Sequence, residues 1–104
     1  MADKWLITGA GGQLGSVLMR QLAQRGDEAV GLVSLSGPMP EGARCVRVDL
    51  SDAGAVREIV QRERPTVIVH AAAVTSIQTA YEQPELTRRV NVEATRVLVE
   101  SAAN

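Results

Sequence analysis

The chain has 104 residues, which suits one domain at most. Hydrophobic residues make up 45% of the sequence, enough for a packed core, and the formal net charge of −1 argues against nucleic acid or an anionic membrane as the main partner. No apolar run approaches the ~18–20 residues of a membrane span, no signal-peptide pattern opens the chain, and the single cysteine, Cys45, excludes an internal disulfide and a thiolate metal cluster, so we expect a cytoplasmic protein.

The first predicted elements are two strands with a helix between them. Residues 5–7 (WLI) form a short apolar run that predicts a buried strand, and residues 28–33 (EAVGLV) predict a second one. Between them, Gly26 is a helix C-terminal signal. The apolar residues of that helix recur at helical spacing: Leu14, Val17, Leu18 and Leu22.

The middle of the chain predicts a loop, a strand and a second helix. Residues 34–42 (SLSGPMPEG) are too rich in Ser, Gly and Pro for a helix, whereas residues 45–50 (CVRVDL) alternate as a strand does. Ser51 is the predicted cap of a helix that ends before Pro65. The apolar face of this helix is expected to consist of Val56, Ile59 and Val60.

The last third predicts a strand, a loop and a long helix. Residues 66–70 (TVIVH) are the most strand-like run in the chain, and residues 71–83 form a loop. Pro84 suits the first position of a helix. One face of that helix is expected to carry Leu86, Val90, Ala94, Val97 and Leu98.

The order of these elements is β-α-β-β-α-β-α. Continuous apolar strands separated by helices predict a parallel sheet that is covered on both faces. Right-handed crossovers then give the strand order 3-2-1-4. The expected fold class is therefore α/β, a three-layer Rossmann-type half with four strands and three helices, and residues 1–104 are expected to form a single dinucleotide-binding domain.

A glycine-rich turn joins the first strand to the first helix. Gly9, Gly12 and Gly15 follow a G-x-x-G-x-x-G spacing that permits a tight turn, a close approach to a pyrophosphate and close packing of the helix on the sheet. The alternative is an ordinary strand-to-helix turn. The residues expected to hold a dinucleotide here are Thr8, Gly9, Gly11, Gly12, Gln13, Leu14 and Gly15.

Four segments resemble the extended short-chain dehydrogenases/reductases. Residues 8–15 (TGAGGQLG) resemble the T-G-x-x-G-x-x-G signature of that family, and residues 70–73 (HAAA) resemble its H-x-A-A segment. Asp49-Leu50 matches an acid–hydrophobic pair after the third strand, and residues 90–95 (VNVEAT) are similar to V-N-x-x-G-T, with Ala94 in place of glycine. Three further features look most like the dTDP-4-dehydrorhamnose reductases and related sugar-nucleotide reductases: the short link between the second and third strands, residues 64–75 (RPTVIVHAAAVT) and residues 83–95 (QPELTRRVNVEAT). The chain corresponds to the N-terminal portion only.

The resemblance implies roles for residues after the third and fourth strands. It places Asp49 and Leu50 at an adenine and Ala71, Ala72 and Ala73 against a ribose. From the residues alone, Asp49 can equally be the acid at a helix N-terminus, and the alanines can serve tight packing. His70 is expected to be a buried histidine with satisfied hydrogen bonds, and Asn91, by resemblance, braces the fourth strand.

The family's catalytic pair, Tyr-x-x-x-Lys, has no match in the sequence. Tyr81 is the only tyrosine and is followed four residues later by Glu85, while the only lysine is Lys4. We therefore expect a truncated chain, inactive by itself, whose full-length parent transfers hydride between a nicotinamide and a nucleotide-sugar carbonyl. Thr75 and Ser76 can touch substrate, although loop polarity explains them equally well. The alternatives are a non-catalytic NADP-binding regulatory subunit, as in methionine adenosyltransferase, or a small α/β interaction module with structural glycines.

NADP is expected to be preferred over NAD. The end of the second strand carries Ser34 rather than the carboxylate that binds a ribose 2′-hydroxyl in NAD sites. Asp27 and Glu28 begin that strand, away from the crevice. Ser34 and Ser36 can donate to a 2′-phosphate, and Arg44 is the nearest cation if the loop lets it reach.

The fourth strand is expected to lie at an edge of the sheet. Residues 66–70 would then present unpaired backbone groups and aliphatic side chains, which favours self-association through this strand or, alternatively, an α/β domain of marginal stability.

Overall fold

The computed structural model describes residues 3–72 and 81–102. Its strands are β1 (Lys4–Thr8), β2 (Glu28–Val33), β3 (Cys45–Arg47) and β4 (Val67–His70). They pair in parallel in the order β3-β2-β1-β4, with Leu6 opposite Val30 and Ile68. The predicted fold class and strand order are confirmed.

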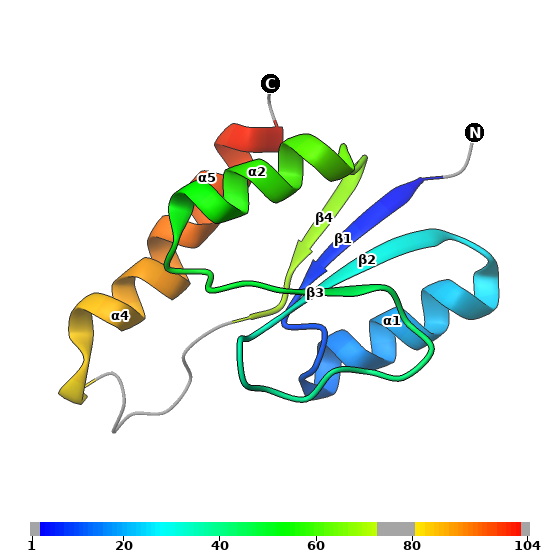
Figure 1. The fold of residues 1–104 in the computed structure, drawn as a ribbon, viewed down its shortest axis with the longest axis horizontal. Helices are drawn as coiled ribbons and strands as arrows, with labels where there is room; N and C mark the ends of the chain where they lie inside the picture. The colour runs from blue at the N-terminus through cyan, green and yellow to red at the C-terminus, as the bar shows by residue number, and fades with distance from the viewer. Residues whose placement is uncertain (1–2, 73–80, 103–104) are drawn as a thin grey trace.

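The helices cover both faces of this sheet. Their bounds are α1 (Gln13–Arg25), α2 (Ala53–Glu63), α4 (Pro84–Arg88), η1 (Arg89–Glu93) and α5 (Ala94–Ala102). Helix α1 packs on β1 and β2, whereas α2 and α5 pack against each other on the other face (Figure 1). In the part of the chain that the structure describes, no helix is long and apolar enough to cross a membrane.

Two hydrophobic clusters separate the three layers. Leu6, Val30 and Leu32 face α2 and α5, and Ile7 and Val33 face α1. The first cluster is completed by Val48, Val56, Ile59, Val60, Val97 and Leu98. Because neighbouring residues of a strand point to opposite faces, a run such as Leu6-Ile7 must be apolar on both sides to bury both layers.

The buried face of α1 differs from the prediction. Leu14 and Val17 are 62% and 41% exposed, while Gly15, Met19 and Leu22 are buried. Helix α1 touches the glycine turn at Gly15, where a Cβ would lie 2.9 Å from Ala10 Cα, and its buried face runs from Gly15 through Met19 and Leu22.

The start of α2 and the length of β3 also differ from the prediction. The carboxylate of Asp52, not the hydroxyl of Ser51, accepts the hydrogen bond from Ala55 N at 3.1 Å and caps the helix. Strand β3 ends at Arg47, because the chain leaves the sheet before Asp49 to reach this cap.

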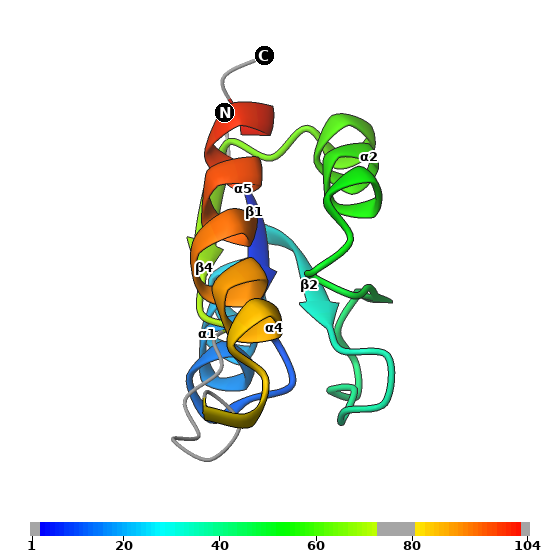
Figure 2. The ribbon, with the colours of Figure 1, turned by 90° about the vertical axis from the view of Figure 1, so that its left-hand side faces the viewer.

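The predicted last helix is continuous but not uniform. Figures 1 and 2 show α4 and α5 as successive parts of one rod, joined by the π-helical segment η1. Leu86 of α4 and Val90 of η1 line a cavity near the ends of the strands. Ala94, Val97 and Leu98 of α5 are buried in the core. The same continuous helix therefore contributes α5 to the core and α4 and η1 to the wall of a cavity.

Candidate functional site

The glycine turn after β1 is built from very close backbone contacts. Gly9 has a φ of +66°, and a Cβ there would lie 2.8 Å from Ala72 N. A Cβ on Gly15 would lie 2.0 Å from the carbonyl oxygen of Gly9. Positive φ and backbone contacts of this kind exclude larger residues, so both glycines are required by the chain itself.

Gly12 lies in a different environment. It has a φ of −82°, it is the N-cap of α1, and a Cβ there would meet nothing closer than Gly9 O at 3.4 Å. No side chain in the described residues caps α1, and its first turn holds no acidic residue. The N–H of Gly12 donates to Gly9 O, but no described side chain caps the N–H groups that follow it in the first turn of α1. These amides and the positive end of the helix dipole are therefore available to an anion that approaches over Gly12.

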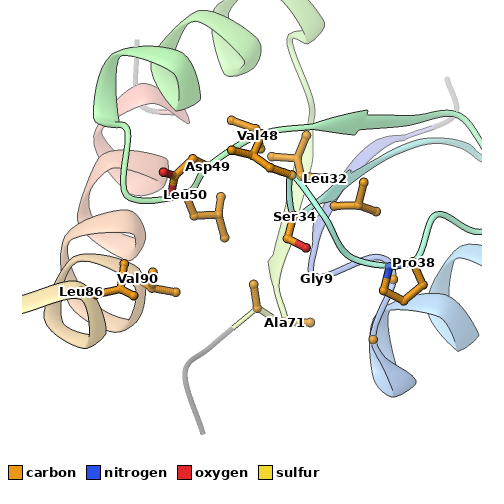
Figure 3. Close-up of a pocket in the computed structure, with 15 residues that line it drawn as sticks. Gly9, Leu32, Ser34, Pro38, Val48, Asp49, Leu50, Ala71, Leu86 and Val90 are labelled. Atoms are coloured by element: carbon orange, nitrogen blue, oxygen red, sulfur yellow. The ribbon is translucent and has the colours of Figure 1, made fainter. Parts of the chain in front are cut away.

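A cavity of about 730 Å³ opens beside this turn, at the carboxyl ends of the strands (Figure 3). It is lined by Gly9, Gly11, Gly12, Leu32, Val33, Ser34, Leu35, Pro38, Val48, Asp49, Leu50, Ala71, Ala72, Leu86 and Val90. This volume falls within the usual range of ligand pockets, and apolar side chains line most of the wall. An apolar slot that leads to a glycine turn and an uncapped helix fits a nucleotide carrying a pyrophosphate.

The structure brings most of the predicted site residues to this cavity. Those that line it are Gly9, Gly11, Gly12, Ser34, Asp49, Leu50, Ala71 and Ala72. Thr8, Gln13, Leu14 and Gly15 do not line it, and Ala73, Thr75 and Ser76 lie outside the described residues. The lining residues not predicted as part of the site are Leu32, Val33, Leu35, Pro38, Val48, Leu86 and Val90. The one pattern in the sequence that could have identified any of them is the helical spacing of Leu86 and Val90. By itself, that spacing predicts only a helix face buried in the core.

Thr8 supports the cavity from inside the sheet. Its buried hydroxyl accepts a hydrogen bond from Ala72 N at 3.1 Å and lies 2.6 Å from His70 Nδ1. We assign the hydroxyl hydrogen to the bond with His70 Nδ1, which places the imidazole proton on Nε2. Thr8 thus joins the end of β1 to the segment that carries Ala71 and Ala72.

His70 only partly matches its predicted role. Its Nδ1 is bonded to Thr8, while its buried Nε2 makes no hydrogen bond of normal geometry among the described residues. Burial lowers the pKa of the imidazole, although the backbone of Val90 raises this pKa as a hydrogen-bond partner does. Burial thus favours the neutral form of His70.

Asp49 lies at the edge of the cavity beside the start of α2 (Figure 3). Its Oδ1 accepts hydrogen bonds from Ser51 Oγ at 2.6 Å and from Ser51 N at 2.9 Å. These bonds lower the pKa of the carboxyl. An ionised carboxylate held in this way is a fixed hydrogen-bond acceptor on the wall of the cavity.

The loop after β2 forms another wall. Ser34 Oγ accepts a hydrogen bond from Gly37 N at 2.8 Å, and Arg47 Nη1 donates to Ser34 O and Gly37 O at 2.8 and 2.9 Å. A Cβ on Gly11 would lie 2.2 Å from Pro38 O, so the loop also packs directly on the glycine turn.

Arg44, expected to reach a 2′-phosphate only if the loop allows it, is not near this wall. It precedes β3 at the other end of the sheet, where its guanidinium binds both carboxylate oxygens of Glu63 at the end of α2. Parallel strands have all their amino ends at one edge, so a cation before β3 cannot reach the carboxyl-end crevice.

Comparison with known proteins agrees with this geometry. Residues 5–104 match the NAD dependent epimerase/dehydratase family. The chain is 36% identical over 98 residues to dTDP-4-dehydrorhamnose reductase of Streptomyces griseus, in an alignment that covers 94% of this chain and 29% of the reductase. It is 34% identical over 98 residues to methionine adenosyltransferase 2 subunit beta of Pongo abelii, in an alignment that covers 94% of this chain and 28% of that subunit.

A solved structure shows the same arrangement of elements. The UDP-glucose 4-epimerase of Thermus thermophilus, determined in complex with NAD, superposes with a TM-score of 0.82 at 34% sequence identity. The match covers 94% of this chain and 33% of the epimerase chain. The chain therefore spans about a third or less of each of these relatives.

Proposed function

This chain belongs to the NAD dependent epimerase/dehydratase family, and from that membership we propose that it is the dinucleotide-binding portion of a nucleotide-sugar oxidoreductase similar to dTDP-4-dehydrorhamnose reductase. The single observation that carries the proposal is the uncapped start of α1, which follows a glycine turn and faces a cavity at the strand ends. Gly12 and the first-turn amides would hold the pyrophosphate, and Asp49 and Leu50 would lie at the adenine. The bound nicotinamide would supply the hydride.

We propose NADP as the preferred cofactor. Ser34 lines the cavity at the end of β2, and residues 33–38 (VSLSGP) contain no carboxylate to repel a 2′-phosphate. Glu28 begins β2 at the opposite edge, where its carboxylate lies 3.4 Å from Lys4 Nζ. The expected preference is on the order of tenfold, since ~1.4 kcal/mol sets that ratio.

Calorimetric titration of the full chain with NADP and NAD at one ionic strength tests this proposal. We expect both cofactors to bind, NADP more tightly, and Ser34→Ala to weaken NADP while leaving NAD nearly unchanged. Glu58→Gln, on the exposed face of α2, serves as the control and should change neither affinity. Tighter binding of NAD, or binding of neither cofactor, would refute the corresponding part of the proposal.

We further propose that these 104 residues have no reductase turnover of their own. The only tyrosine, Tyr81, is 87% exposed, and Glu85 stands where the catalytic lysine would be required. With NADPH and a dTDP-4-keto-sugar, we expect no loss of nicotinamide absorbance. A loss that scales with the concentration of the chain, and that Gly15→Val abolishes, would contradict this expectation.

A regulatory subunit is the second candidate, favoured by the 34% identity to methionine adenosyltransferase 2 subunit beta. Such a protein would bind NADP and a partner without turnover. A stable stoichiometric complex with a methionine adenosyltransferase, measured by light scattering after gel filtration, would favour this candidate over the oxidoreductase.

A further inference from the structure

Arg47 occupies a distinct position at the carboxyl end of β3. Both of its hydrogen bonds use Nη1, which donates to Ser34 O and Gly37 O at 2.8 and 2.9 Å. A guanidinium has five N–H donors, so Nε and Nη2 keep donors for a further acceptor. Arg47 thus clamps the loop after β2 with only part of its hydrogen-bonding capacity.

The charge of Arg47 is not balanced by a carboxylate in the described residues. Its two acceptors are neutral carbonyls, whereas Arg44 and Arg96, for example, bind the carboxylates of Glu63 and Glu93. Arg47 is also exposed, so its guanidinium is hydrated and accessible. An unpaired guanidinium with a planar set of donors is well suited to a phosphate group.

The clamped loop connects Arg47, which does not itself line the cavity, to the cavity wall at Ser34. Ser34 lines the cavity, and Figure 3 shows its hydroxyl oxygen pointing toward Gly9. Because that oxygen already accepts the N–H of Gly37, its own hydrogen is free to be donated. The contact between Pro38 O and Gly11 keeps the loop against the glycine turn, so an anion at Ser34 lies on the path that leads to α1.

We infer that Arg47 is a specificity-determining residue of this site, and that its guanidinium binds the 2′-phosphate of NADP together with the hydroxyl of Ser34. The inference rests on the proposed function only in that the cavity takes a dinucleotide. The competing interpretation is that Arg47 merely holds the loop in shape. The two interpretations predict different affinities. A residue that only holds the loop would affect the binding of NAD and NADP equally, whereas a residue that binds the 2′-phosphate would affect NADP alone.

Titrations of the full chain with two pairs of ligands test this inference. The pairs are NADP with NAD, and adenosine 2′,5′-bisphosphate with AMP, so each pair differs by one 2′-phosphate. We expect Arg47→Gln to weaken the phosphorylated member of each pair about tenfold and the other by less than about twofold, since one exposed charge-assisted contact sets a difference of this order. Arg47→Lys should keep part of the preference for the phosphorylated ligand. Arg57 is an exposed arginine of α2, and Arg57→Gln should keep all of that preference.

Added salt gives a second readout. The preference for the 2′-phosphate should fall with ionic strength in the unmodified chain and stay flat in Arg47→Gln, because an exposed charge pair is screened. An equal loss in both members of a pair, or no loss in either, overturns the inference. If the unmodified chain binds neither dinucleotide, the proposed function fails, and the bisphosphate pair alone then decides for or against Arg47.

Discussion

At the scale of single residues, Glu63 is a buried carboxylate surrounded by cations. Its side chain is 3% exposed and binds the guanidinium of Arg44, Lys4 Nζ at 3.3 Å and Arg62 Nε at 3.1 Å. The hydrogen bonds from Arg44, with those from Arg62 and Lys4, lower its pKa from 4.5 to about 2 despite the opposing effect of burial. The group joins the end of α2 to β1 and to the start of β3.

We expect this carboxylate to make stability depend on acid pH. A depressed pKa contributes stability above the unfolded-state value of 4.5, and the contribution is lost as pH falls toward about 2. Glu63→Gln should cost about 2 kcal/mol at pH 7, less than the full shift converts to, because Arg44 and Arg62 are largely solvated.

Urea unfolding of both forms between pH 7 and pH 2 measures this contribution. The difference between Glu63→Gln and the unmodified chain should shrink as pH falls below 4.5. Glu58→Gln, on the same helix but exposed, should show neither the loss at pH 7 nor the convergence. A difference that is constant across this range would rule out the carboxylate as its origin.

At the scale of elements, the start of α2 shows how two adjacent polar residues divide their roles. Asp52 caps the helix through Ala55 N, while Ser51 donates to Asp49 and thereby orients a residue on the cavity wall. Asp52→Ala should cost about 1 kcal/mol in unfolding free energy, the usual value of a lost cap, with little effect on dinucleotide affinity.

Ser51→Ala provides the matched comparison for this prediction. It should cost less stability than Asp52→Ala, and it should weaken both cofactors equally because it removes the hydroxyl bond to Asp49 and leaves only the bond from the backbone N of residue 51. Chemical denaturation and calorimetry on the two variants would show whether the effects separate. If Ser51→Ala lowers the unfolding free energy more than Asp52→Ala does, Ser51 and not Asp52 is the cap of α2.

At the scale of the whole molecule, β4 forms one edge of the sheet and, among the described strands, pairs only with β1. All four residues of β4 are only partly buried, which leaves backbone groups and aliphatic side chains accessible at this edge. We expect the chain to self-associate through this strand, so that sedimentation shows a concentration-dependent mixture.

A charged residue at the edge should reduce this association. Val67→Lys is expected to shift the chain toward monomer, whereas Val99→Lys, on the exposed face of α5, should leave the mixture unchanged. Sedimentation as a single monomer at every concentration, or a larger effect from Val99→Lys, would contradict pairing through β4.

The sequence by itself determined the order of the strands and the position of the glycine turn. Apolar runs bounded by turn residues leave few alternatives once crossovers are right-handed, and Gly9 and Gly15 are required by local backbone geometry. Periodicity could not show that Leu14 and Val17 are exposed, because the buried face of α1 runs through Gly15, Met19 and Leu22 and is set by packing on the turn and the sheet.

Only the tertiary structure decided which further residues complete the lining of the cavity. Leu86 and Val90 reach it because the rod of α4, η1 and α5 passes the strand ends, a contact between segments far apart in the chain. Arg44 and Arg47 are three residues apart, about 10 Å along a strand, so one lies at each end of β3. The register of β3 on β2 places Cys45 opposite Gly31 and Arg47 opposite Val33. Arg47 therefore lies beside the loop after β2 and binds it, whereas Arg44 lies at the opposite end of the sheet and binds Glu63.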